Sequence, residues 1–268
     1  MPVRFSRAAA AALCALAVCL TAQADPHPES QLLAALDDLN DGKVNEAWQA
    51  LDALVKRQPN FRLAQLFYGE LQAARAGAPT RDMSAMSDPE IQGLVEEARL
   101  RMQTWHEAIP DTSVPDVILQ LSATHQHAVV VDLPRARLYL LENRGGALHV
   151  LRNYYASSGK GGWGKRSAGD NRTPVGVYHV TGFISDKALP ELYGAGAFPL
   201  SYPNVWDRRL KYTGSGIWLH GVPRDTFNRA PRSSEGCVTA WNRCGRCRWL
   251  VTCVCLAVSE SSNWSATA

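Results

Sequence analysis

The sequence predicts an α+β protein in which an N-terminal helical segment precedes a mostly β domain. Leucines recur at helical spacing between residues 30 and 77. From residue 128 onward, short runs rich in β-branched and aromatic residues alternate with turns of Gly, Pro, Asn and Asp. Residues 110–124 show neither pattern and are interpreted as a linker. We therefore expect four parts: a signal peptide (1–24), a helical region (25–122), a mostly β domain (123–242) and an atypical Cys-rich tail (243–268).

The helical region is expected to contain at least four helices. Three are predicted around Leu32–Leu39, over 44–57 and over 61–76, with Gly42, Pro59 and Gly77 ending them in turn. Short helices around tight turns resemble a tetratricopeptide hairpin, although no second copy of the unit is present. A further helix is predicted from Ser87, where Ser87 and Glu90 fit a capping box. Its apolar stripe is expected to serve packing: Ile91, Leu94, Val95, Ala98, Met102 and Trp105.

Five strand ranges are expected in the second half of the chain, and a further strand is expected to begin at Val238. Each is a β-rich run bounded by turn residues, and the predicted ranges are 128–131, 137–141, 147–155, 175–183 and 216–220.

The first 24 residues have the pattern of a cleaved export signal. Arg4 and Arg7 precede an apolar run over 8–20, and Ala22-Gln23-Ala24 fits the cleavage pattern. The run is too short to span a bilayer, so we expect export to the periplasm and no stable membrane span. Removing Arg4 and Arg7 leaves 26 Lys and Arg against 25 Asp and Glu. This near-neutral balance gives no electrostatic reason to expect a nucleic-acid partner.

Two motifs outside the main site allow more than one interpretation. Residues 159–166, "GKGGWGKR", nearly match a phosphate-binding loop, but Arg166 stands where Ser or Thr would be needed and helix-breaking residues follow. We interpret them instead as a surface loop or a substrate-facing loop carrying Lys160, Lys165 and Arg166. The paired cysteines of the tail, Cys244 with Cys247 and Cys253 with Cys255, suggest zinc, but the second pair is too tightly spaced for a usual zinc knuckle. A disulfide or an artefact is the preferred interpretation, and no metal or organic cofactor is expected.

His220 and Cys237 are the candidate catalytic pair. An apolar strand leads into His220, and Gly221 allows the chain to turn after it. Gly236 precedes Cys237, so that a tight turn can direct main-chain N–H groups at an oxyanion. A free thiol has a pKa of about 8.5, and an imidazole that takes its proton makes it a nucleophile. The alternative from spacing alone is a buried cysteine beside a structural histidine.

This region resembles the L,D-transpeptidase catalytic domain, or YkuD domain, in the branch common in Gram-negative bacteria. The resemblance rests on His220-Gly221, on Ser234-Glu235-Gly236-Cys237-Val238, and on Thr173, Pro174, Gly176 and Tyr178 of "GDNRTPVGVY". "AFPLSYPN" and "GIWLHG" agree as well, and the likeness covers roughly residues 125–242.

The resemblance implies roles for several residues. Cys237 would be the nucleophile that forms a thioester and His220 the acid/base, oriented by the Gly221 carbonyl. The main-chain N–H groups of Glu235, Gly236 and Cys237 would form the oxyanion hole. Arg232 and Ser234 are candidates for binding the substrate. Arg232 would pair with a stem carboxylate or be a solvated loop charge.

The implied substrate is a peptidoglycan tetrapeptide stem, and the implied product a cross-link between stems or an attached protein. The alternatives are an L,D-carboxypeptidase or amidase, and an inactive cell-wall-binding protein. The helical region would bind a protein partner or position the catalytic domain. The likeness ends near Asn242, and we interpret the tail as a shifted reading frame or a degenerate end whose domain would lack an edge element of its sheet.

Overall fold

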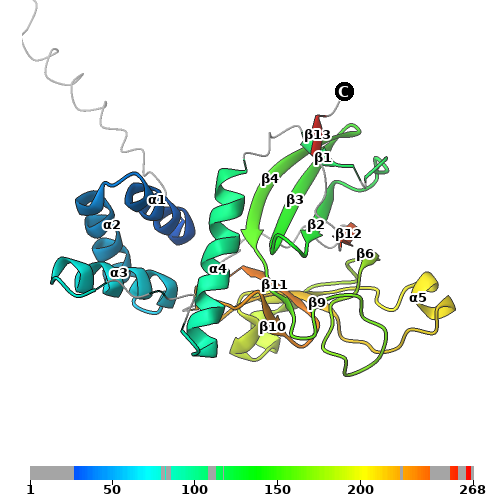
Figure 1. Ribbon diagram of the computed structural model, residues 1–268. Coiled ribbons are helices and arrows are strands. Elements are labelled where there is room, and N and C mark those ends of the chain that lie inside the picture. The colour runs from blue at the N-terminus through cyan, green and yellow to red at the C-terminus, as the bar shows by residue number, and fades with distance from the viewer. Residues whose placement is uncertain are drawn as a thin grey trace, which may run out of the picture.

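The computed structural model describes residues 27–79, 82, 86–107, 113–116, 118–223, 226–241, 254–258 and 264–266. The expected signal peptide (1–24) lies outside these residues, as do Cys244, Cys247 and Cys253. The described chain consists of a group of helices, a long bridging helix and a domain of β sheets (Figure 1). The predicted α+β class is confirmed.

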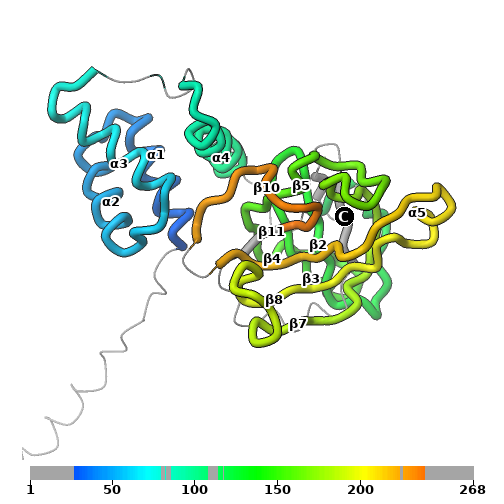
Figure 2. Tube along the Cα trace, turned by 90° about the horizontal axis from the view of Figure 1, so that it is seen from below, coloured from blue at the N-terminus to red at the C-terminus, as the bar shows by residue number. Residues whose placement is uncertain are grey.

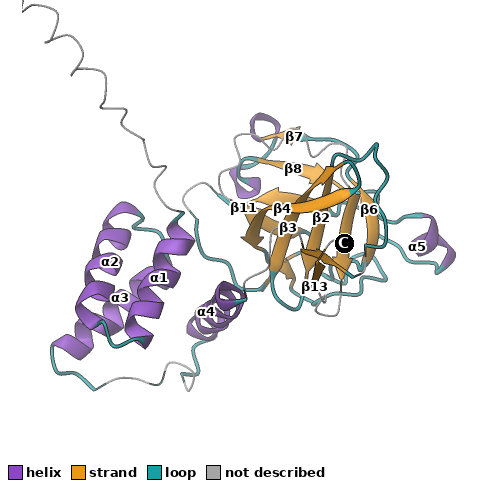
Figure 3. Ribbon diagram, turned by 90° about the horizontal axis from the view of Figure 1, so that it is seen from above, coloured by secondary structure: helices purple, strands orange, loops and turns teal. Residues whose placement is uncertain are grey.

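The first three helices pack together around an apolar core. They are α1 (Pro28–Asn40), α2 (Val44–Arg57) and α3 (Arg62–Arg75), and tight turns join them (Figure 3). The leucines predicted to share a face do so, because residues three and four apart lie on one side of a helix. The buried members of this core are Leu32, Ala35, Leu36, Leu51, Leu54, Phe61, Leu63, Ala64 and Ala98.

Helix α4 (Pro89–His106) lies between these helices and the β domain. Its N-cap is Asp88, whose carboxylate accepts from the N–H of Glu90 at 2.8 Å, so the predicted cap at Ser87 was wrong by one position. Pro89 supplies the first helical residue, and the cap therefore falls directly before it. The packing stripe is confirmed at Leu94, Ala98 and Met102, which contact the helical core. Leu100, on another side of α4, packs with Ala136 and Tyr155 of the β domain.

The larger sheet has five strands in the order β4-β3-β2-β12-β6. These are β2 (His127–Asp132), β3 (Arg137–Arg144), β4 (Ala147–Tyr155), β6 (Gly176–His179) and β12 (Val254–Val258). Strands β2, β3 and β4 form an antiparallel meander, while β12 runs parallel to β2 and antiparallel to β6. Both faces of this sheet are covered, which explains why β2 is buried throughout and reads as an unbroken apolar run.

A second sheet carries the candidate catalytic strands in the order β11-β9-β8-β7. It contains β7 (Ile184–Ser185), β8 (Gly196–Pro199), β9 (Trp218–Gly221) and β11 (Val238–Trp241). The main core of the domain lies between the two sheets, where Val129, Leu138 and Leu140 meet Phe198, Leu219 and Val238. Two-stranded pairs join β5 (Ser158–Gly159) to β10 (Arg232–Ser234) and β1 (Ser113–Pro115) to β13 (Trp264–Ala266). The short helices η2 (Asp186–Ala188), η3 (Glu191–Tyr193) and α5 (Val205–Arg209) lie in the loops.

Two expectations are corrected by these sheets. The predicted linker contains β1, and its apolar residues Val114, Ile118 and Leu121 pack against the outer face of the larger sheet. The tail does not leave that sheet incomplete, because β12 occupies an interior position between β2 and β6. The apolar residues of 254–258 suit such a position, whatever the origin of the tail. Its interpretation as a shifted frame stays a prediction.

Within the described ranges, no helix has both the length and the apolar character needed to cross a bilayer.

Candidate active site

Strands β9 and β11 bring His220 and Cys237 together. The two strands run parallel, with Val238 opposite Leu219 and residue 239 opposite His220. Val238 and Leu219 both point into the core between the sheets. Because side chains alternate along a strand, Cys237 and His220 lie on the other face of this strand pair. A histidine and a cysteine seventeen positions apart thus share one face of the strand pair, two register positions from each other.

His220 is held in the tautomer that a general base requires. Its Nδ1 lies 2.7 Å from the carbonyl oxygen of Gly221, which can only accept, so Nδ1 carries the proton and Nε2 the lone pair. His220 is 3% exposed, and the centroid of its ring lies 5.0 Å from that of Tyr193 in an edge-to-face arrangement. Burial lowers the pKa of His220 to about 4, the charge of Arg229 adds to this, and the bond to Gly221 opposes it. The imidazole is therefore neutral at pH 7.

The Cys237 thiol is partly buried and donates to the carbonyl oxygen of Gly216 at 3.4 Å. Burial raises its pKa, and the charge of Glu235 adds to the rise. A main-chain hydrogen bond from Trp218 and the positive charges of Arg229 and Lys165 act in the opposite direction. Thiol and imidazole are thus both neutral at rest, and the proton would move to Nε2 as the sulfur attacks.

The turn before Cys237 directs two carbonyl groups toward the interior. The oxygen of Ser234 accepts from the N–H of Lys160 at 2.7 Å, and the oxygen of Gly236 accepts from the Thr173 hydroxyl at 3.0 Å. In a trans peptide the C=O and the following N–H point in opposite directions. The N–H groups of Glu235 and Cys237 therefore point away from these partners. Gly236 has φ +114, a conformation that favours glycine.

The loop over 160–172 supports this turn from the side. The Asp170 carboxylate accepts from Lys165 Nζ at 2.7 Å and from the N–H groups of Arg166 and Ser167, which keeps the pKa of Asp170 well below its usual range despite the opposing effect of burial. No helix follows "GKGGWGKR" among the described residues of this segment; β5 instead pairs with β10 beside the catalytic turn. Lys165 is buried and its Nζ pairs with Asp170. The interpretation of this loop as substrate-facing stays a prediction.

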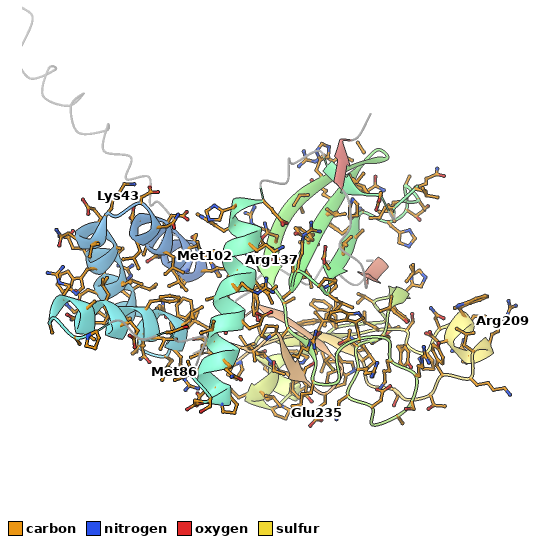
Figure 4. The ribbon with its side chains drawn as sticks, in the orientation of Figure 1. Lys43, Met86, Met102, Arg137, Arg209 and Glu235 are labelled. Atoms are coloured by element: carbon orange, nitrogen blue, oxygen red, sulfur yellow. The ribbon has the colours of Figure 1, made fainter. Side chains whose placement is uncertain are left out.

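The two residues predicted to bind substrate differ in exposure. The guanidinium carbon of Arg232 lies over the Trp163 ring, 5.2 Å from its centroid, and its residue is exposed. Ser234 is 3% exposed and its hydroxyl donates to the carbonyl oxygen of Cys237, which fixes the turn. Glu235 lies at the exposed margin of the domain (Figure 4).

Arg229 is the charged residue near the site that the sequence did not single out. Its charge acts on both Cys237 and His220, and its Nε donates to the Ser233 hydroxyl at 2.9 Å. In the segment "TFNRAPR" no spacing distinguishes it from Arg232. Only its partners in the folded chain do so.

In the part of the chain that the structure describes, no three His, Cys, Asp or Glu residues gather in a way that would hold a metal ion.

Comparison with known proteins gives one family match. Residues 126–243 match the family described as the L,D-transpeptidase catalytic domain, YkuD. The resemblance seen in the sequence is confirmed over these residues. The search of curated proteins gives no match.

Several solved structures are similar to the chain. One is Bd1075 of Bdellovibrio bacteriovorus, with 30% identity over 57% of this chain and 56% of that chain and a TM-score of 0.45. Another is the helical cell shape determining protein Pgp2 of Campylobacter jejuni, with 20% identity over 64% and 57% and a TM-score of 0.46. An L,D-transpeptidase of Xylanimonas cellulosilytica has 18% identity over 69% and 76% and a TM-score of 0.29. The matches span less than two thirds of the first two proteins.

Proposed function

We propose that the protein is a peptidoglycan L,D-transpeptidase of the periplasm that works through a thioester on Cys237. The observation that carries this proposal is the placement of Cys237 and His220 on one face of the β9–β11 pair, with His220 fixed by Gly221 as a neutral base. The YkuD family match over this domain supports the substrate class.

The first half-reaction follows from this geometry. The sulfur of Cys237 attacks the carbonyl carbon of the L,D peptide bond in a tetrapeptide stem, while Nε2 of His220 takes the thiol proton. The N–H groups of Glu235, Gly236 and Cys237 stabilise the oxyanion. The C–N bond then breaks, His220 returns the proton to the departing amine, and D-alanine leaves. The stem remains joined to sulfur as a thioester.

The second half-reaction transfers the stem. An amine of another stem attacks the thioester carbonyl, His220 accepts the proton of that amine, and the C–S bond breaks. The proton then returns to Cys237. The product is a cross-link between stems, and no metal or organic cofactor takes part. Arg232, exposed over Trp163, is proposed to meet a stem carboxylate, whereas Ser234 acts by holding the carbonyl of Cys237.

Mass spectrometry of the purified protein with a disaccharide-tetrapeptide tests the proposal. We expect a thioester adduct on Cys237 and a cross-linked dimer, both absent from Cys237→Ala and both retained in Cys255→Ala, which removes a cysteine of β12 instead. A shortened tripeptide without dimer would replace transfer by hydrolysis. A folded protein that forms no adduct but still binds cell wall would make the domain an inactive binding module.

A further inference from the structure

The segment that joins β9 to the catalytic turn lies against the N-terminal helices. Figure 2 shows the orange chain before β10 passing between α4 and the β domain. The carbonyl oxygen of Phe227 accepts from Arg101 at 3.1 Å, and its ring lies 5.5 Å from that of Phe61. The side-chain oxygen of Asn228 accepts from the N–H of Leu63 at 3.2 Å. Helices α3 and α4 therefore hold two consecutive residues of this segment.

Glu97 of α4 is the centre of this contact. It is 0% exposed, and its carboxylate accepts from Arg101 at 2.7 and 2.9 Å and from the N–H of Arg229 at 3.1 Å. Asn228 lies within 3.5 Å of both carboxylate oxygens. Burying a carboxylate is unfavourable unless hydrogen bonds and an opposite charge compensate it. The network is consequently sensitive to position, because each displaced partner leaves a buried polar group unsatisfied.

Arg229 is fixed from both sides of its main chain. Its N–H donates to Glu97, and its carbonyl oxygen accepts from the Tyr155 hydroxyl at 2.8 Å. Its side chain bonds Ser233, four residues further along the chain and next to the catalytic turn. These three contacts leave the guanidinium little freedom, and its charge acts on both Cys237 and His220.

We propose that Glu97 is a positioning residue, which through the main chain of Arg229 places that guanidinium beside the Cys237–His220 pair. The N-terminal helices are then part of the catalytic apparatus. Arg229 stabilises the thiolate as it forms, since an opposite charge nearby favours the ionised thiol. This role rests on the proposed function, in which Cys237 is the nucleophile, but the reactivity of the thiol is measurable without substrate.

The experiment measures the rate at which iodoacetamide alkylates Cys237 across a range of pH. Trypsin cleaves after Arg232 and Arg243, and the resulting peptide of residues 233–243 contains Cys237 as its single cysteine, so its mass reports the alkylation. The variants are Arg229→Gln, Glu97→Ala, Glu97→Gln and the double variant Arg229→Gln/Glu97→Ala in the full chain. Glu96→Ala is the matched control, because Glu96 neighbours Glu97 on α4 but is exposed and pairs with Arg99. His220, Lys165 and Glu235, the other charged or titratable groups that act near the thiol, remain unchanged in all variants.

We expect Arg229→Gln to slow alkylation at neutral pH by roughly fivefold, with the profile displaced to higher pH, as loss of a nearby positive charge requires. Glu97→Ala should produce the same displacement. Glu97→Gln should alkylate at nearly the parent's rate, because its amide oxygen still accepts from the N–H of Arg229. Glu96→Ala should match the parent. In the double variant the two effects should not add, because Glu97 acts through Arg229.

Additive losses in the double variant, or an unchanged profile in either single variant, would overturn the proposal. A cleft of about 610 Å³ reaches Glu97 between α3, α4 and residues 226–230, so water has room to replace the deleted carboxylate. Should Glu97→Ala still fail to fold by circular dichroism, Asn228→Ala removes the anchor from the other side, and an unchanged profile there overturns the proposal equally. If the parent protein transfers no peptide stem but its Cys237 is alkylated as expected, the proposed function is contradicted and the role of Glu97 is not.

Discussion

Replacing Gly236 with alanine tests how strictly the catalytic turn depends on its backbone. Gly236 has φ +114, a region in which a residue with a side chain is strained by about 1–3 kcal/mol. A Cβ at this position would lie 2.9 Å from the carbonyl oxygen of Arg172 and 3.3 Å from Cδ1 of Ile217. The first neighbour is main chain and gives way poorly.

The expected magnitude follows from these contacts. Moving the peptide to relieve the clash also weakens the hydrogen bond from the Thr173 hydroxyl to the Gly236 oxygen, which contributes about 0.5–1.5 kcal/mol. The sum is a loss of roughly 2–4 kcal/mol in the free energy of unfolding. The same movement turns the N–H of Cys237, so thioester formation should fall further than stability alone explains.

Urea denaturation and mass spectrometry of the acyl-enzyme measure both effects. Gly182→Ala is the matched control, because a Cβ at Gly182 meets no atom within 4 Å. We expect this control to unfold at the parent's urea concentration or slightly above it. A Gly236→Ala protein that is as stable as the control and still forms the adduct would refute the argument.

Two further predictions concern buried titratable groups. With its pKa lowered to about 4 by burial, His220 binds fewer protons in the folded than in the unfolded chain between about pH 6.5 and pH 4, so stability falls as the pH drops through this window. His220→Gln should remove about 2–3 kcal/mol of that decline, measured by urea unfolding at pH 7 and pH 4.5, and an equal decline in both proteins would contradict it. Asp170→Asn should lower the free energy of unfolding by roughly 2–3 kcal/mol, because it leaves the buried ammonium of Lys165 without its counter-charge. An unchanged midpoint of urea unfolding would contradict this and show that solvent screens the pair.

Some elements could be predicted from the sequence because their signal is local. The leucine spacing of α1 to α3 and the apolar runs of β2 to β4 each lie within a few residues of one another. Strand β8 carries no such signal. It contains Gly196 and Pro199, and it is a strand because Phe198 is buried between the two sheets. A contact of this kind depends on the assembled core and cannot be seen in a short window of sequence.

The residues of the candidate site likewise differ in whether the sequence near them carries a signal. His220 and Cys237 were predicted because a strand, two glycines and a family motif surround them. Arg229 was missed because its N–H bonds Glu97, 132 positions earlier in the chain. Glu97 and Arg101 in turn form an i,i+4 pair, which on a surface helix is a solvated pair of small effect.

The burial of that pair changes what α4 does. Arg101 also contacts Glu29 of α1 at 2.7 Å, and Glu29 contacts Arg137 of β3, which faces α4 in Figure 4, at 3.1 Å. Two carboxylates and two guanidinium groups thus compensate one another, drawn from α1, α4 and β3. Such a network stabilises the fold only where its geometry is kept, because a displaced partner leaves a charge buried and unpaired. Helix α4, which the sequence predicts to serve only packing, therefore also positions the β domain and the segment that leads into Cys237.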